Sequence, residues 1–153
     1  MADASQVDAL YQEIILDHYK QKHGSGLRDP FESEVHHVNP TCGDEVTLRV
    51  HLDAGTVSDV SYDAVGCSIS QASASVLNDL VVGKPVDDAF ATLDAFQALM
   101  QGKGEVEPDE DVLEDGIAFA GVAQFPARVK CALLSWMAFK DATSQALSTQ
   151  EDV

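Results

Sequence analysis

About a third of the way along the chain, an unbroken alternation of apolar and polar residues constrains the fold most strongly. Apolar side chains occupy every second position from Val46 to Leu52, and successive side chains of a strand point to opposite faces of a sheet. A turn is predicted at residues 53–55, after which residues 57–65 return as the second strand of an antiparallel hairpin. Residues 34–38 supply a short further strand. One face of this sheet is therefore apolar and has to be buried by other segments.

The segments expected to bury it are those in which the spacing of apolar residues changes to that of a helix. Helices are predicted over residues 5–22, from residue 68 to a stop at Gly83, and over 86–100 and 126–147. Residues 105–115 contain seven acidic residues and a proline, so they are expected to form a solvated connection with a helical turn near Val112. Strands grouped early and helices later predict an α+β fold, a small antiparallel three-stranded sheet covered by helices.

Size and composition favour one domain over residues 1–153, with about 5–147 ordered and a flexible tail. The formal charge of −17, from 26 acidic against 9 basic residues, argues against nucleic acid as a partner, because phosphate binding needs clustered Lys and Arg. No run of about 18 apolar residues predicts a membrane span, and no leader segment is recognisable. We expect a cytoplasmic protein with no membrane partner. Three cysteines cannot all pair within the chain, so reduced thiols or metal ligands are favoured.

The three cysteines lie beside polar or glycine neighbours, where a loop or strand meets the next predicted element. Cys42 precedes Asp44 by two residues, Cys67 lies at the start of a predicted helix, and Cys131 lies on the second turn of the last helix. Zinc in closed sites takes four such ligands in a tetrahedron, so these four residues are candidates for one zinc site. Antiparallel pairing brings the first three to one edge of the sheet. Simpler interpretations remain open: Cys67 as a small buried side chain and Asp44 as a turn residue.

Two basic residues flank the last cysteine. Arg128 and Cys131 are three positions apart and share a helix face, and Lys130 adjoins them. Three thiolates and a carboxylate exceed the charge of one zinc ion, so nearby cations would offset the difference. The alternative is that both basic residues are solvated charges on a helix.

The histidines are less informative. His36 and His37 are adjacent on a predicted strand, so they point to opposite faces and are expected to have structural or surface roles. His18 stands beside Asp17 and is interpreted as a surface pair or a docking contact.

Larger motifs resemble the IscU/NifU-like family in order and register over nearly the whole chain. They are Leu10-Tyr11 with residues 14–19, then residues 39–44, 66–75 and 126–131. Within the family the chain is most similar to the SufU branch, because Lys130 stands where IscU scaffolds carry a histidine and because residues 68–130 are longer than in IscU. The resemblance implies an α+β fold, zinc ligation by Cys42, Asp44, Cys67 and Cys131, and a position for Arg128 next to the site.

The resemblance also implies an activity. A SufS-type, pyridoxal-phosphate-dependent cysteine desulfurase would deliver persulfide sulfur to Cys42. Cys42 would first be released from the zinc ion, because a histidine of the desulfurase takes its place as a ligand. The sulfur would then pass to a downstream iron-sulfur assembly scaffold. Two alternatives remain: a scaffold that binds an iron-sulfur cluster through the same thiolates, and a non-catalytic zinc-binding activator of the desulfurase.

Overall fold

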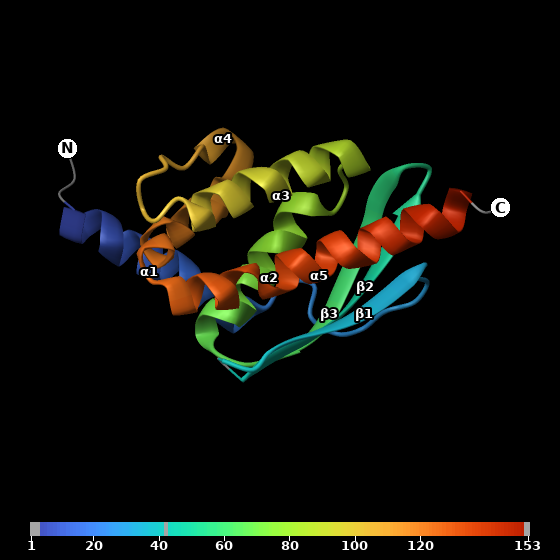
Figure 1. Cartoon of the computed structure of the whole chain (residues 1–153), viewed down its shortest axis with the longest axis horizontal. Coiled ribbons are helices and arrows are strands. Elements are labelled where there is room, and N and C mark those ends of the chain that lie inside the picture. Colours follow the sequence, from blue (N-terminus) through green and yellow to red (C-terminus); the bar gives the residue numbers. More distant parts are fainter. Residues whose placement is uncertain (1–3, 42, 152–153) are drawn as a thin grey trace.

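The computed structural model describes residues 4–41 and 43–151, and it shows a three-stranded antiparallel sheet with helices packed over it (Figure 1). The strands, in the spatial order β1-β2-β3, are β1 Ser33–Asn39, β2 Asp44–Asp53 and β3 Thr56–Val65. The helices are α1 Ala4–Gln21, α2 Ser68–Val81, α3 Val86–Gln101, α4 Glu110–Leu113 and α5 Pro126–Glu151, with a 3-10 segment η1 Glu114–Gln124. The predicted fold class is confirmed.

The alternation of β2 determines which face of the sheet is buried. The four apolar side chains at every second position of β2 are at most 2% exposed, and Val50 pairs with Val60 across β2 and β3. The long helix α5 lies across this face, packed against β1 and β2 (Figure 1), while α2 follows β3 and packs against α5. Helix α5 therefore covers β1 and β2, and α2 lies beside it next to β3.

Aromatic side chains fill the space between the helical layers. Trp136 of α5 is fully buried and stacks on Phe96 of α3, with ring centroids 4.2 Å apart and planes 10° from parallel. Its indole N–H donates to Ser73 Oγ of α2 at 2.9 Å, so the one polar atom of the ring is satisfied. These contacts fix α5 against α2, which matters because Cys67 caps the start of α2 and Cys131 lies in α5.

The acidic connection is partly as predicted. The helical turn near Val112 is present as α4. The sequence did not predict η1, in which Ala118, Phe119 and Val122 are buried; glycines at 116 and 121 weaken any local helix signal, and packing against α1, α3 and α5 holds the segment. Among the described helices, none has the length and apolar character needed to cross a bilayer.

Candidate metal centre

The β2–β3 hairpin brings Asp44 and Cys67 together. Asp44 is the first residue of β2, and its neighbour Glu45 pairs with Val65 at the end of β3. Cys67 follows two residues later as the N-cap of α2. Its backbone N–H donates to Asp44 Oδ1 at 2.8 Å, and its Sγ lies 3.8 Å from Asp44 Oδ2. The loop and the helix start thus meet at one edge of the sheet, as antiparallel pairing requires.

Asp44 is fully buried, and Gly66 is what leaves room for it. A Cβ built on Gly66 would lie 2.0 Å from Asp44 Oδ1 and 2.7 Å from its Cγ, and Gly66 has φ +148°. A buried carboxylate is costly unless hydrogen bonds or a cation compensate for its lost hydration. The hydrogen bond from the Cys67 N–H meets part of this need, and a bound metal ion would meet the rest. The sequence places Gly66 directly before Cys67, but its role in making room for Asp44 depends on the pairing of β2 with β3.

Cys131 approaches from the second turn of α5. It is 3% exposed, and its Sγ lies 3.5 Å from the carbonyl oxygen of Ala127. Ligand atoms of Asp44, Cys67 and Cys131 all lie within 4.8 Å of one another. The structure therefore gathers three of the four predicted ligands, although they are far apart in the sequence. Cys42, the fourth, lies outside the described residues.

The donor set fits zinc. Thiolate sulfur and carboxylate oxygen are both ordinary zinc ligands, and a closed zinc site needs four of them. The three gathered residues supply two sulfurs and one carboxylate, and Cys67 is exposed on the solvent side while Asp44 and Cys131 are buried. The site is thus open to an approaching molecule at one side and anchored in the core at the other.

Arg128 and Lys130 are both exposed at the start of α5. The Arg128 guanidinium lies over the Phe125 ring, 5.6 Å from its centroid, and lines a cavity of about 380 Å³ together with Tyr11 and Ile69. Among the described residues, neither Arg128 nor the other residues lining this cavity belong to the group formed by Asp44, Cys67 and Cys131.

The interpretation of His18 as a surface group was wrong. His18 is 2% exposed and bonds to Ser75 and Asp115, while its neighbour Asp17 accepts from Gln21 instead. Asp115 is 97 residues away in the chain, so no local pattern could reveal the contact.

The adjacent histidines of β1 diverge as predicted. His36 bonds to Thr47 and His37 to Asp141 of α5, and neither belongs to the group formed by Asp44, Cys67 and Cys131.

The fold and the site together define a small α+β protein with a cysteine- and carboxylate-lined candidate metal centre. Residues 10–132 match the model of the NifU-like N terminal domain, and the chain belongs to this family, the IscU/NifU-like proteins. It is 41% identical over 142 residues to the zinc-dependent sulfurtransferase SufU of Bacillus subtilis, covering 92% of this chain and 93% of that relative.

Scaffold proteins of the same family are also similar. The iron-sulfur cluster assembly scaffold protein IscU of Streptococcus pyogenes serotype M1 is 38% identical over 146 residues, covering 95% of this chain and 90% of the relative. The crystal structure of a proposed iron-sulfur cluster assembly scaffold protein for the SUF system, from Fervidobacterium islandicum AW-1, superposes with a TM-score of 0.76 at 34% identity, covering 92% of this chain and 98% of that one. The relatives therefore include both a sulfurtransferase and scaffolds.

Proposed function

We propose that this protein is a zinc-dependent sulfurtransferase of iron-sulfur cluster assembly, acting in the cytoplasm with a cysteine desulfurase. The observation that carries the proposal is the gathering of Asp44, Cys67 and Cys131 ligand atoms within 4.8 Å at the end of the hairpin that follows Cys42. The name of the Bacillus subtilis relative supports it, as does Lys130 immediately before Cys131.

Each residue has a distinct role in this proposal. Asp44, Cys67 and Cys131 hold the zinc ion with Cys42 as the fourth ligand, and the bound metal keeps the thiols deprotonated. Asp44 is fixed by burial and by the Cys67 N–H, so it anchors the metal from the core. Arg128 and Lys130, both exposed, offset the excess negative charge of the ligands.

The chemistry is thiol exchange at Cys42. A SufS-type, pyridoxal-phosphate-dependent desulfurase presents a persulfide, and the Cys42 thiolate attacks its outer sulfur. A new S–S bond forms on Cys42 while the S–S bond of the donor breaks, and the desulfurase cysteine leaves as a thiolate. The persulfide on Cys42 then passes its outer sulfur to a downstream scaffold in the same way. No net oxidation occurs, since one persulfide replaces another.

Mass spectrometry of a turnover mixture tests the proposal. Zinc-loaded protein is incubated with a SufS-type desulfurase and cysteine, and the Cys42 peptide is expected to gain the mass of one sulfur atom. A Cys42→Ser variant should bind the desulfurase but gain no sulfur and no longer stimulate it. Absence of persulfide on wild-type Cys42 during active turnover would exclude sulfur transfer and leave the non-catalytic activator.

The scaffold alternative is favoured by the similarity to the Streptococcus pyogenes protein and uses the same ligands. Anaerobic reconstitution with iron and sulfide distinguishes a scaffold from a sulfurtransferase. A sulfurtransferase retains zinc and shows no stable visible absorption from a cluster, whereas a scaffold exchanges zinc for iron and becomes coloured.

A further inference from the structure

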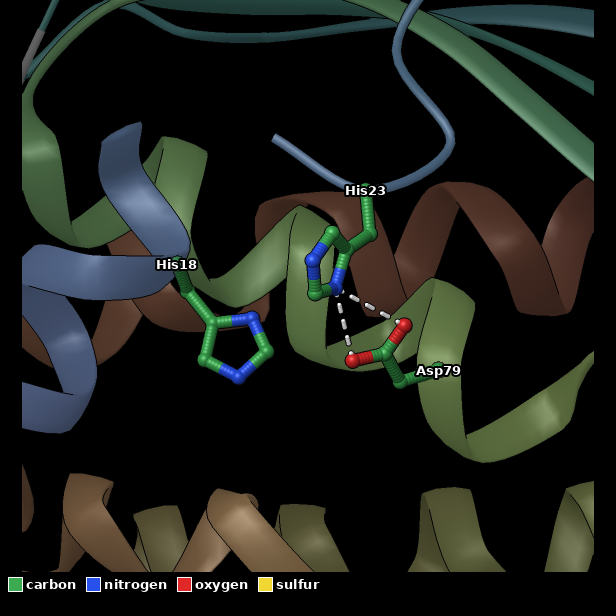
Figure 2. Close-up of side chains that lie close together, drawn as sticks. All are labelled: His18, His23 and Asp79. Carbon is green, nitrogen blue, oxygen red and sulfur yellow. Dashed lines mark hydrogen bonds and ion pairs between the residues drawn. The ribbon is translucent and has the colours of Figure 1, made fainter. Parts of the chain in front are cut away.

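A second cluster of metal-ligating side chains lies where α1 ends against α2. His18 of α1, His23 of the following loop and Asp79 of α2 point toward one another (Figure 2), with ligand atoms within 4.8 Å. Asp79 is near the end of α2 and Cys67 caps its start, so the two sites are separated by about 18 Å of helix at 1.5 Å per residue. The cluster is therefore independent of the centre at Asp44.

The hydrogen bonds of the two rings follow the pattern of metal-bound histidines. His18 Nε2 lies 2.8 Å from Asp115 Oδ2, and His23 Nε2 lies 2.5 Å from Gln21 Oε1. Gln21 is held in this orientation because its amide nitrogen donates to Asp17 Oδ1 at 2.8 Å. A histidine that binds metal through one nitrogen almost always donates its other N–H to a carboxylate or carbonyl oxygen. Both rings already make that second bond.

The remaining ring nitrogens are the Nδ1 atoms of the two histidines, and each already has a partner at the cluster. His18 Nδ1 lies 2.8 Å from Ser75 Oγ, which itself accepts from the His23 backbone N–H at 3.0 Å. The Ser75 hydroxyl therefore has to turn away from His18 Nδ1 before this nitrogen can bind a metal ion. His23 Nδ1 lies 2.8 and 3.0 Å from the two Asp79 oxygens, so a cation could be held between this nitrogen and the carboxylate.

We propose that His18 Nδ1, His23 Nδ1 and the Asp79 carboxylate bind a divalent cation of the zinc class, with water as the fourth ligand. Two nitrogens, one carboxylate oxygen and an open position form a known zinc ligand set. A histidine binds metal through an unprotonated nitrogen, so any proton on the Nδ1 atom of either ring is released when the metal binds.

The cluster must contract slightly to hold the ion. Two ligands at about 2.0–2.1 Å from a tetrahedral zinc lie about 3.3 Å apart, whereas the ligand atoms here spread over as much as 4.8 Å. His23 and Asp79 have side chains 36% and 44% exposed and can rotate inward. The His18 side chain is 3% exposed and supplies the fixed ligand.

An acidic entrance adjoins the cluster. A cavity of about 120 Å³ lies between α2 and the start of η1, lined by Asp79, Glu114 and Asp115. Asp79 belongs to the cluster, and Asp115 is the hydrogen-bond partner of His18. The formal charge of −17 on the chain also raises the local concentration of cations. The acidic connection of residues 105–115, which had no role from sequence alone, ends at this entrance.

Cobalt titration tests the proposal, because Co²⁺ reports its ligands by visible absorption. Protein loaded with one equivalent of zinc should bind one equivalent of Co²⁺ with weak bands of nitrogen and oxygen ligation and without sulfur charge-transfer absorption. His23→Gln and Asp79→Asn should each abolish that equivalent, and Asp115→Asn should weaken it about 10- to 100-fold. The matched control is His51→Gln, which removes a histidine paired with Glu32 at 2.9 Å elsewhere in the chain and should retain full binding.

Two results would overturn the site: wild-type protein that takes up no Co²⁺ with this spectrum, or a His23→Gln variant that binds as well as wild type. The readout is the equivalent lost in His23→Gln, so it does not depend on which metal occupies the centre at Asp44. Circular dichroism of each variant shows that the fold is retained, and His23 and Asp79 are exposed enough for this to be expected.

Discussion

Replacing Gly66 by alanine should disrupt the candidate metal centre, because the added methyl group meets one of its ligands. The new Cβ would lie 2.0 Å from Asp44 Oδ1 and 3.0 Å from the Asp44 Cα, well inside van der Waals contact. The Asp44 carboxylate has to move, and it then loses the hydrogen bond from the Cys67 N–H. A methyl group added next to the ligand Cys67 would thus act directly on the other ligand, Asp44.

Two contributions set the magnitude. A hydrogen bond to a charged group is worth about 1.5–3 kcal/mol, and holding a non-glycine residue at a sparsely populated φ costs about 1–3 kcal/mol. Together they lower the free energy of unfolding by about 2.5–6 kcal/mol. For a chain of this size, each kcal/mol shifts the Tm by about 2–4 °C, so the expected fall is about 5–24 °C. Zinc content should fall with it.

The matched control is Gly55→Ala in the β2–β3 turn. Gly55 has φ +81° but no heavy atom within 4 Å of an added Cβ, so this variant carries the conformational cost without the clash. Thermal unfolding and metal analysis are compared for the two variants. The reasoning is refuted if Gly66→Ala keeps wild-type zinc content and its Tm falls no further than that of Gly55→Ala.

Three further substitutions test the packing and the charges around the core. Tyr62→Phe should raise the free energy of unfolding, measured by urea denaturation, by about 1 kcal/mol, because the buried hydroxyl has no hydrogen-bond partner among the described residues. Burial also raises the pKa of Tyr62 in the folded protein. The wild-type phenol therefore costs stability as the pH rises past about 10, where the unfolded phenol ionises, and the variant lacks this contribution. Ser73→Ala should cost about 1–3 kcal/mol by leaving the Trp136 indole N–H unpaired. A hydrogen bond from His37 lowers the pKa of Asp141. The stabilisation that this hydrogen bond provides is therefore lost only as the pH falls through the lowered pKa of Asp141. His37→Gln should raise the pKa of Asp141, measured by carbon-13 NMR titration of its carboxyl group.

The sheet could be predicted because its signal is local. The alternation from Val46 to Leu52 fixes which side chains are buried, and the turn that follows fixes the antiparallel partner. From these two facts the meeting of Asp44 and Cys67 follows, since both lie at the same end of the hairpin.

Other features depend on packing between distant segments. The approach of Cys131 requires α5 to lie across β1 and β2, which no pattern within α5 specifies. The segment η1 combines small residues and glycines with a three-residue period, and it is held by packing against the surrounding helices rather than by its own propensity. His18 likewise bonds to Asp115 at the start of η1 and to Ser75 of α2, and neither contact could be read from the sequence around His18.

The central claim is that Cys42, Asp44, Cys67 and Cys131 bind one zinc ion. X-ray absorption at the zinc edge tests it most directly, on His23→Gln protein carrying one equivalent of zinc so that the second cluster does not contribute. The account predicts three sulfur ligands at about 2.3 Å and one oxygen at about 2.0–2.2 Å. A protein that binds no zinc, or a ligand shell containing only nitrogen and oxygen, would contradict it.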